Sequence, residues 1–97
     1  MKGKRGGIPL DSRLFLYDDT IEAKTRFVSF AGESSRFDLA IITTSRFYGK
    51  QLVLDLQSSR FAIIGSDDLA EEGYLEHIFQ LSEEEAAELH SFLEEIV

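Results

Sequence analysis

"RFDLAIITTSRFYGKQLVLDLQSSRFAIIG", residues 36–65, contains three apolar runs with polar turn residues between them. The runs cover residues 36–44, 50–56 and 60–65, and they are rich in the residue types that favour β-strands. Connections as short as those between the runs join neighbouring strands into antiparallel hairpins. This stretch therefore predicts an antiparallel meander in the middle of the chain.

The sequence on either side extends the predicted sheet. "KTRFVSFA" at residues 24–31 and "RLFLY" at residues 13–17 have the composition of two further strands. Residues 74–81 predict a sixth strand, with a short helix as the alternative. The sheet is therefore expected to have five or six strands, to be mainly antiparallel and to be twisted.

A helix is predicted at the C-terminal end of the chain. Ser82 and Glu85 have the spacing of a capping box. The apolar residues after them form one helical stripe, opposite a face of glutamates: Ala86, Leu89, Phe92, Leu93 and Ile96. A shorter helical turn is predicted before it, capped by Ser66 and ended by Gly73. The fold class is therefore α+β, an antiparallel meander with a C-terminal helix packed on one face.

A four-residue motif recurs along the predicted sheet. "SSRF" occurs at residues 34–37 and 58–61, and near copies occur at residues 24–27 and, in a predicted loop, at 44–47. The serines suit turns, because their hydroxyls bind local backbone groups. Successive strand residues point to opposite faces, so we expect the phenylalanine of the motif to point into the core and the arginine to point outward. The repeat is interpreted as hairpin architecture.

The second face of the predicted sheet is also partly apolar. Ala40, Ile42, Ala62 and Ile64 are assigned to it by the same alternation. A small antiparallel sheet usually exposes one face to water, so an apolar second face needs a cover. A helix, the N-terminal segment or another subunit would provide one. This face motivates the hypothesis of a homodimer.

Charge is distributed unevenly along the 97 residues, whose net charge is −8. Residues 1–66 hold ten Lys and Arg and seven acids, a balance of +3. Residues 67–97 hold eleven acids and no Lys or Arg, a balance of −11. A dimer could therefore also form between the acidic region of one copy and the basic sheet edge of another, and salt would weaken such a dimer.

Length and composition predict a single domain at residues 12–97, preceded by a flexible basic leader at residues 1–11. The chain has no cysteine, which fits a reducing cytosol. No apolar run is long enough for a membrane helix, and the basic start lacks the apolar region of a secretion signal. We therefore expect a cytoplasmic protein with no membrane contact.

Residues that commonly carry catalysis form no recognisable motif. The aspartate pairs are Asp18 with Asp19 and Asp67 with Asp68. Their spacing matches no calcium loop, and adjacent aspartates suit turns. His77 and His90 would need a carboxylate such as Glu76 to hold catalytic zinc, and nothing in their spacing demands it. A nucleophile elbow and a glycine-rich phosphate loop are both missing, so we expect no enzyme activity, no metal and no cofactor.

An arginine–aromatic set is the remaining candidate binding site. Its members are Arg36, Arg46, Phe47, Tyr48, Lys50 and Arg60. On one surface they could hold single-stranded nucleic acid by phosphate contacts and base stacking. Asp38 and Asp55 near the outward arginines, and a pI of about 4.6, argue against this. The favoured function is a non-enzymatic protein-binding or regulatory module that acts as a homodimer. Nucleic-acid binding through the sheet edge and the Arg46–Lys50 loop is the alternative.

Most of the chain also resembles a known family. The blocks include "FLYDDT" (15–20), "KTRFVSF" (24–30), "FYGKQLVLDLQSSRFAIIG" (47–65) and "FQLSEEEAAELHSFL" (79–93). These blocks are similar to domain of unknown function 3055, a small family of low-GC Gram-positive bacteria. The resemblance implies a short cytosolic protein with no assigned activity, no known cofactor and no catalytic residues to carry over.

Overall fold

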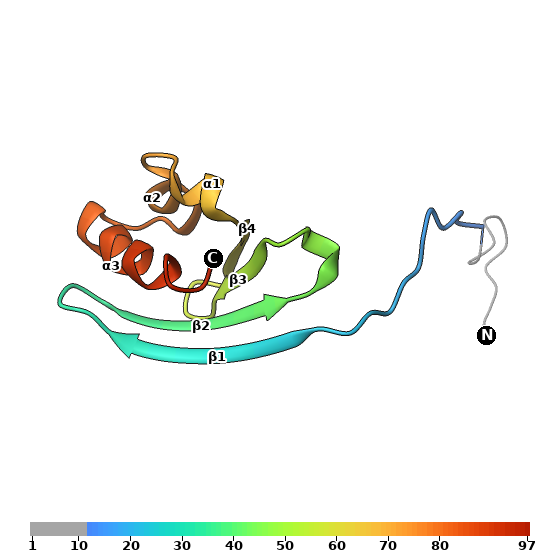
Figure 1. Cartoon of the computed structure of the whole chain (residues 1–97), viewed down its shortest axis with the longest axis horizontal. Helices are drawn as coiled ribbons and strands as arrows, with labels where there is room; N and C mark the ends of the chain where they lie inside the picture. Colours follow the sequence, from blue (N-terminus) through green and yellow to red (C-terminus); the bar gives the residue numbers. More distant parts are fainter. Residues whose placement is uncertain (1–11) are drawn as a thin grey trace, which may run out of the picture.

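The computed structural model describes residues 12–97, which form one layer of strands and one layer of helices (Figure 1). The strands are β1 (Lys24–Ala31), β2 (Arg36–Thr43), β3 (Gln51–Asp55) and β4 (Arg60–Ile64). The helices are α1 (Ser66–Leu69), α2 (Tyr74–Phe79) and α3 (Glu83–Leu93), and a 3-10 turn, η1, covers Ser45–Phe47. The predicted basic leader at residues 1–11 lies outside the described residues.

The sheet is the antiparallel meander that residues 36–65 predict. Its strands follow one another in the order β1-β2-β3-β4, and every neighbouring pair is antiparallel. The register places Leu39 opposite Asp55 and Val53 opposite Ala62. The α+β class is confirmed, but the sheet of the described residues has four strands rather than five or six.

Two of the predicted strands are wrong. Residues 12–23 contain no strand. "RLFLY" has a strand-like composition, but it pairs with none of the four strands, and a strand needs a hydrogen-bonded neighbour. Residues 74–79 form α2, the alternative for that segment. Leu75 and Phe79, four residues apart, are both buried, which is helical spacing. Gly73 precedes them with a φ of 79°, a conformation that glycine adopts without steric cost.

All three helices lie on the same face of the sheet (Figure 1). One buried cluster joins the two layers. It contains Phe37, Leu39, Val53, Ala62 and Ile64 from the sheet and Leu69, Leu75, Phe79, Ala86, Leu89 and Leu93 from the helices. Each large apolar side chain in such a core contributes roughly 1.5–3 kcal/mol to stability. The expected packing of the C-terminal helix on one face of the sheet is therefore observed.

The start of α3 has the predicted capping box. Ser82 Oγ accepts the backbone N–H of Glu85 at 3.1 Å, and Glu85 Oε1 accepts the backbone N–H of Ser82 at 2.9 Å. The predicted apolar stripe of α3 faces the core. Helix α1 begins one residue earlier than predicted, because its N-cap is Gly65 and not Ser66. No helix within residues 12–97 is both long and apolar enough to cross a membrane.

Strand β4 is turned the opposite way to the prediction. Ala62 and Ile64 are buried under the helices, whereas Phe61 and Ile63 are exposed on the other face. Helices α1 and α2 contact β4, and the small side chain of Ala62 lets them pack closely against the strand. The phenylalanine of the repeated motif is therefore inside at Phe37 and outside at Phe61.

Candidate functional site

The sheet face that points away from the helices, called the open face below, is largely apolar. The register aligns two rows of side chains across all four strands. One row is Phe27, Ala40, Leu54 and Phe61, and the other is Thr25, Ile42, Leu52 and Ile63. Phe27 is 74% exposed and Phe61 is 66% exposed. Because a soluble sheet normally carries polar side chains on its uncovered face, this face is the candidate site.

The sequence predicts an apolar second face, but a partly different set of residues forms it. Ala40 and Ile42 lie on the open face, whereas Ala62 and Ile64 belong to the core. The other large apolar residues of the open face are Phe27, Leu52, Leu54, Phe61 and Ile63. A signal for the two leucines is present in "LVLDL" (52–56), where leucine occupies every second position and therefore one face of β3.

Charged side chains on the described strands of the open face are confined to Arg36 and Asp38, and these two neutralise each other. Arg36 Nε lies 3.3 Å from Asp38 Oδ2, and Gln57 Nε2 donates to the same oxygen at 2.8 Å. A hydrogen bond from Ser29, followed by the charge of Arg36, lowers the pKa of Asp38 below its usual value. The pair stays ionised at neutral pH, so the open face carries no net charge from its strands.

The loop between β2 and β3, residues 44–50, contacts the extended segment of residues 12–23, called the arm below. The guanidinium of Arg46 lies 4.5 Å from the ring centre of Tyr17, and its Nη1 lies 3.7 Å from Asp19 Oδ2. Phe47 is half-buried. Tyr48 is 95% exposed and has a φ of 54°. Arg46 is therefore already engaged with an aromatic ring and a carboxylate of the arm.

Lys50 ties the same loop to α1. Its Nζ donates to Asp68 Oδ2 at 3.0 Å and to Asp67 Oδ2 at 3.4 Å. The backbone N–H of Gly65 donates to Asp68 Oδ2 at 2.8 Å. This backbone bond, and after it Lys50, lower the pKa of Asp68, while the bond to Asp68 raises the pKa of Lys50. Lys50 therefore makes a structural contact between two segments of the fold.

The arginine–aromatic set predicted from the sequence is spread over two ends of the sheet. Arg36 begins β2 and Arg60 begins β4, both at one end, whereas Arg46 and Lys50 lie at the other. The eight residues of β2 separate these ends by roughly 26 Å, at about 3.3 Å per residue. Arg60 forms no ion pair with Asp55, whose buried carboxylate accepts a backbone N–H at 3.1 Å. The six residues do not line a single surface.

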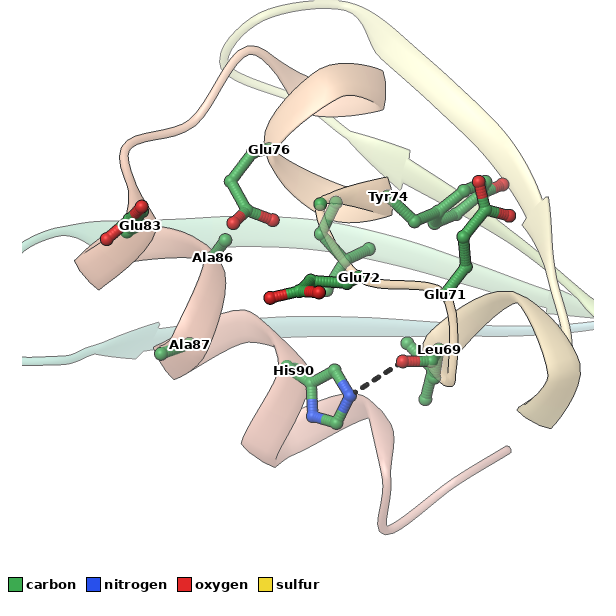
Figure 2. Close-up of a pocket in the computed structure, with 11 residues that line it drawn as sticks. Leu69, Glu71, Glu72, Tyr74, Glu76, Glu83, Ala86, Ala87 and His90 are labelled. Carbon is green, nitrogen blue, oxygen red and sulfur yellow. Dashed lines mark hydrogen bonds between the residues drawn. The ribbon is translucent and has the colours of Figure 1, made fainter.

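A hollow of about 210 Å³ lies among the helices. Figure 2 shows the carboxylates of Glu72 and Glu76 and the imidazole of His90 around it. His90 Nε2 lies 3.0 Å from the carbonyl oxygen of Leu69, and its Nδ1 lies 3.7 Å from Glu94 Oε2. Within residues 12–97, no three histidines or acids are grouped so that they could hold a metal ion. The hollow is acidic, but it contains no assembled set of ligands.

The remaining metal candidates lie in separate parts of the fold. Asp18 and Asp19 belong to the arm, and Asp67 and Asp68 belong to α1. Arg46 pairs with the first of these segments and Lys50 with the second. His77 is exposed on α2. Asp19, Asp67 and Asp68 therefore serve as partners of basic side chains.

Comparison with known proteins gives one family. Residues 16–95 match a family model described as SAV0927-like, so the match runs from the arm to the end of the helical layer. No curated protein matches the chain. The expectation of a small uncharacterised family is confirmed, but the match does not carry the label domain of unknown function 3055.

Proposed function

The chain belongs to the SAV0927-like family, and from the geometry of its sheet we propose that it is a non-enzymatic cytosolic module that binds protein through its open face, first of all a second copy of itself. The observation that carries this proposal is the pair of largely apolar rows across all four strands, uncovered by any described helix. Apolar surface of this extent on a soluble protein marks a site of interaction.

The open face offers a large gain on burial. Phe27 and Phe61 are more exposed than buried, and covering each of them would contribute roughly 1.5–3 kcal/mol. Leu52, Leu54 and Ile63 lie beside or between them in the two rows and add to the same surface. The two phenylalanines lie on the edge strands and flank the aliphatic residues of the inner strands. Aromatic and aliphatic side chains are both common in the buried centre of a protein interface.

The distribution of charge supports a second copy as the partner. The eleven acids of residues 67–97 lie in the helical layer, on the other side of the sheet from the open face. A second copy that covers the open face therefore lies on the side of the sheet away from the acidic layer. The Arg36–Asp38 pair leaves the open face itself neutral, so the face does not repel a second copy. A two-fold axis that relates the two copies would let each copy cover the open face of the other.

Light scattering after size-exclusion chromatography tests this proposal. The unmodified protein is expected to be a dimer at micromolar concentration, and Phe27→Ser with Phe61→Ser is expected to be a monomer with an unchanged circular dichroism spectrum. Tyr48→Ser is the matched control, because Tyr48 is an exposed aromatic residue in the β2–β3 loop, away from the open face. An unmodified protein that is strictly monomeric, or a face variant that remains dimeric, would overturn the proposal.

Single-stranded nucleic acid is the rival occupant, and the same protein preparation tests it. Phosphate contacts make affinity fall steeply with salt. Because Arg46 and Lys50 are already paired with acids, fluorescence anisotropy with labelled single-stranded RNA and DNA is expected to show no saturable binding. Saturable, salt-sensitive binding that Arg46→Ala and Tyr48→Ala both weaken would replace the proposal with this rival.

A further inference from the structure

The arm carries a second apolar surface that the core does not use. It contains Leu14, Phe15, Leu16, Tyr17 and Ile21, and all five side chains are exposed. Leu14 and Leu16 are 86% and 90% exposed, and none of the five belongs to the buried cluster. Five large apolar residues within eight positions are far more than a solvated linker needs.

The path of the arm leads away from its own open face. It continues from the start of β1 and runs out beyond the end of the sheet, as Figure 1 shows for the blue segment. Arg46 holds it on this path through its contacts with Tyr17 and Asp19. To cover its own open face, the arm would have to reverse between Asp19 and Lys24 and give up both contacts. On this path the arm leaves its own open face uncovered.

We propose that the arm of one copy lies on the open face of a second copy, and that the exchange is reciprocal. This proposal rests on the proposed dimerisation through the open face and names the segment that covers it. Both surfaces are apolar, and each lacks a covering element within residues 12–97 of its own chain. A reciprocal exchange buries both without disturbing either fold.

The dimensions of the two surfaces agree. Residues 14–21 span roughly 26 Å when extended, at about 3.3 Å per residue. The open face measures roughly 15 Å across four strands and roughly 17 Å along five residues of a strand, so its diagonal is of similar length. Two buried aromatic side chains in each arm remove roughly 300–500 Å² from water. The total surface buried by two arms and by the two faces that they cover would then exceed roughly 1,200 Å², the size of the smaller stable interfaces.

Disulfide trapping tests the exchange directly, because the chain has no cysteine of its own. Leu16→Cys places a thiol on the arm, and Ile63→Cys places one on β4, the edge strand farthest from β1. The two single variants, carrying tags of different size, are mixed and oxidised. The expected product is a disulfide between the two different chains. Ser91→Cys, on the exposed side of α3, is the control and is expected to form no disulfide with Leu16→Cys.

Two results would overturn the exchange. One is a mixture of Leu16→Cys and Ile63→Cys that yields no more cross-linked product than the Ser91→Cys control. The other is a disulfide that forms within one chain when both cysteines are placed in the same dilute protein, since the arm would then cover its own sheet. Either result is obtained with a folded protein, because Leu16 and Ile63 lie outside the buried cluster.

A second measurement separates this inference from the proposed function. Leu14→Ser with Leu16→Ser removes apolar surface from the arm and leaves the core intact. The dissociation constant of the dimer is expected to rise by about tenfold or more, since two arms lose two buried leucines each. A dimer that is lost on changing Phe27 and Phe61, but unaffected by the arm variant, would keep the proposed function and disprove the arm exchange. A monomeric unmodified protein would remove both.

Discussion

Lys50 Nζ lies 3.0 Å from Asp68 Oδ2, and this contact fastens the loop after β2 to the first turn of α1. Asp68 also accepts the backbone N–H of Gly65, so one carboxylate joins the loop, the end of β4 and the helix. The packing is close at this point, because a Cβ on Gly65 would come within 2.9 Å of Lys50 Cγ. The junction therefore depends on an ionised Asp68.

Asp68→Asn is expected to make folding less sensitive to acid. The folded pKa of Asp68 lies below the ordinary value of 3.8, so its charge stabilises the fold above that value. The contribution is lost as the pH falls through the lowered pKa. The variant should be less stable than the parent by about 1 kcal/mol at pH 7, from the weakened hydrogen bonds, and should lose less stability below about pH 4. Urea unfolding across this pH range measures both effects.

Asp67→Asn is the matched control for that prediction. Asp67 neighbours Asp68 in the sequence, but its side chain is mostly exposed and lies farther from Lys50, at 3.4 Å. Its removal is expected to leave the acid sensitivity of the parent in place. Equal acid sensitivity in the Asp68→Asn variant and the parent would contradict the role given to Asp68.

Ser82→Ala is expected to lower the free energy of unfolding by about 1 kcal/mol, the usual cost of losing an N-cap side chain. Ser82 Oγ accepts the N–H of Glu85 at the first turn of α3, and this helix supplies Ala86, Leu89 and Leu93 to the core. Thermal or urea unfolding measures the loss. Ser91→Ala, on the exposed side of the same helix, should change stability by less than about 0.5 kcal/mol. Similar losses for both serines would show that the cap is not the cause.

The strands and the capped helix could be predicted from the sequence because their signals are local. Each predicted strand of the meander is bounded by turn residues, and Ser82 with Glu85 lies before a stripe of helical spacing. The face of β4 could not be predicted in the same way. It depends on the register with β3, which is set through the turn at residues 56–59 and the left-handed Ser59, with a φ of 63°. A change of one residue in that register exchanges Phe61 with Ala62.

In the candidate site too, local features could be predicted from the sequence and features that depend on tertiary contacts could not. The apolar character of the open face could be predicted from Ala40 and Ile42, which alternate with Leu39 and Ile41, and from the leucine at every second position of "LVLDL". The basic residues could be recognised one by one, but not as a surface. The pair of Arg36 with Asp38 is local, whereas the contacts of Arg46 with the arm and of Lys50 with α1 depend on the tertiary fold. Contacts between segments that are distant in the sequence therefore could not be predicted.

Gly32→Ala is expected to destabilise the fold by about 1 kcal/mol through Glu88. A Cβ at residue 32 would overlap the carboxylate of Glu88, which accepts the backbone N–H of Ser34 at 2.8 Å. The φ of Gly32 lies outside the left-handed region, so backbone strain does not contribute. In a Glu88→Ala background the same change should cost much less, because the overlapping group is gone. Urea unfolding of the four proteins gives the coupling, and strictly additive costs would contradict it.

Dimerisation through the open face is expected to be nearly independent of salt, or slightly stronger at high salt. The open face is neutral, since Arg36 and Asp38 pair with each other, and the acidic helices of the two copies would face away from one another. Salt therefore screens only a weak long-range repulsion between two chains of charge −8. Sedimentation equilibrium at about 50 mM and about 500 mM NaCl should give dissociation constants within about threefold of each other. A dimer that dissociates at high salt would instead join the acidic region 67–97 of one copy to a basic sheet edge of another. In that arrangement the substitutions at Phe27 and Phe61 would leave the dimer intact, so the two measurements together decide which surface is used.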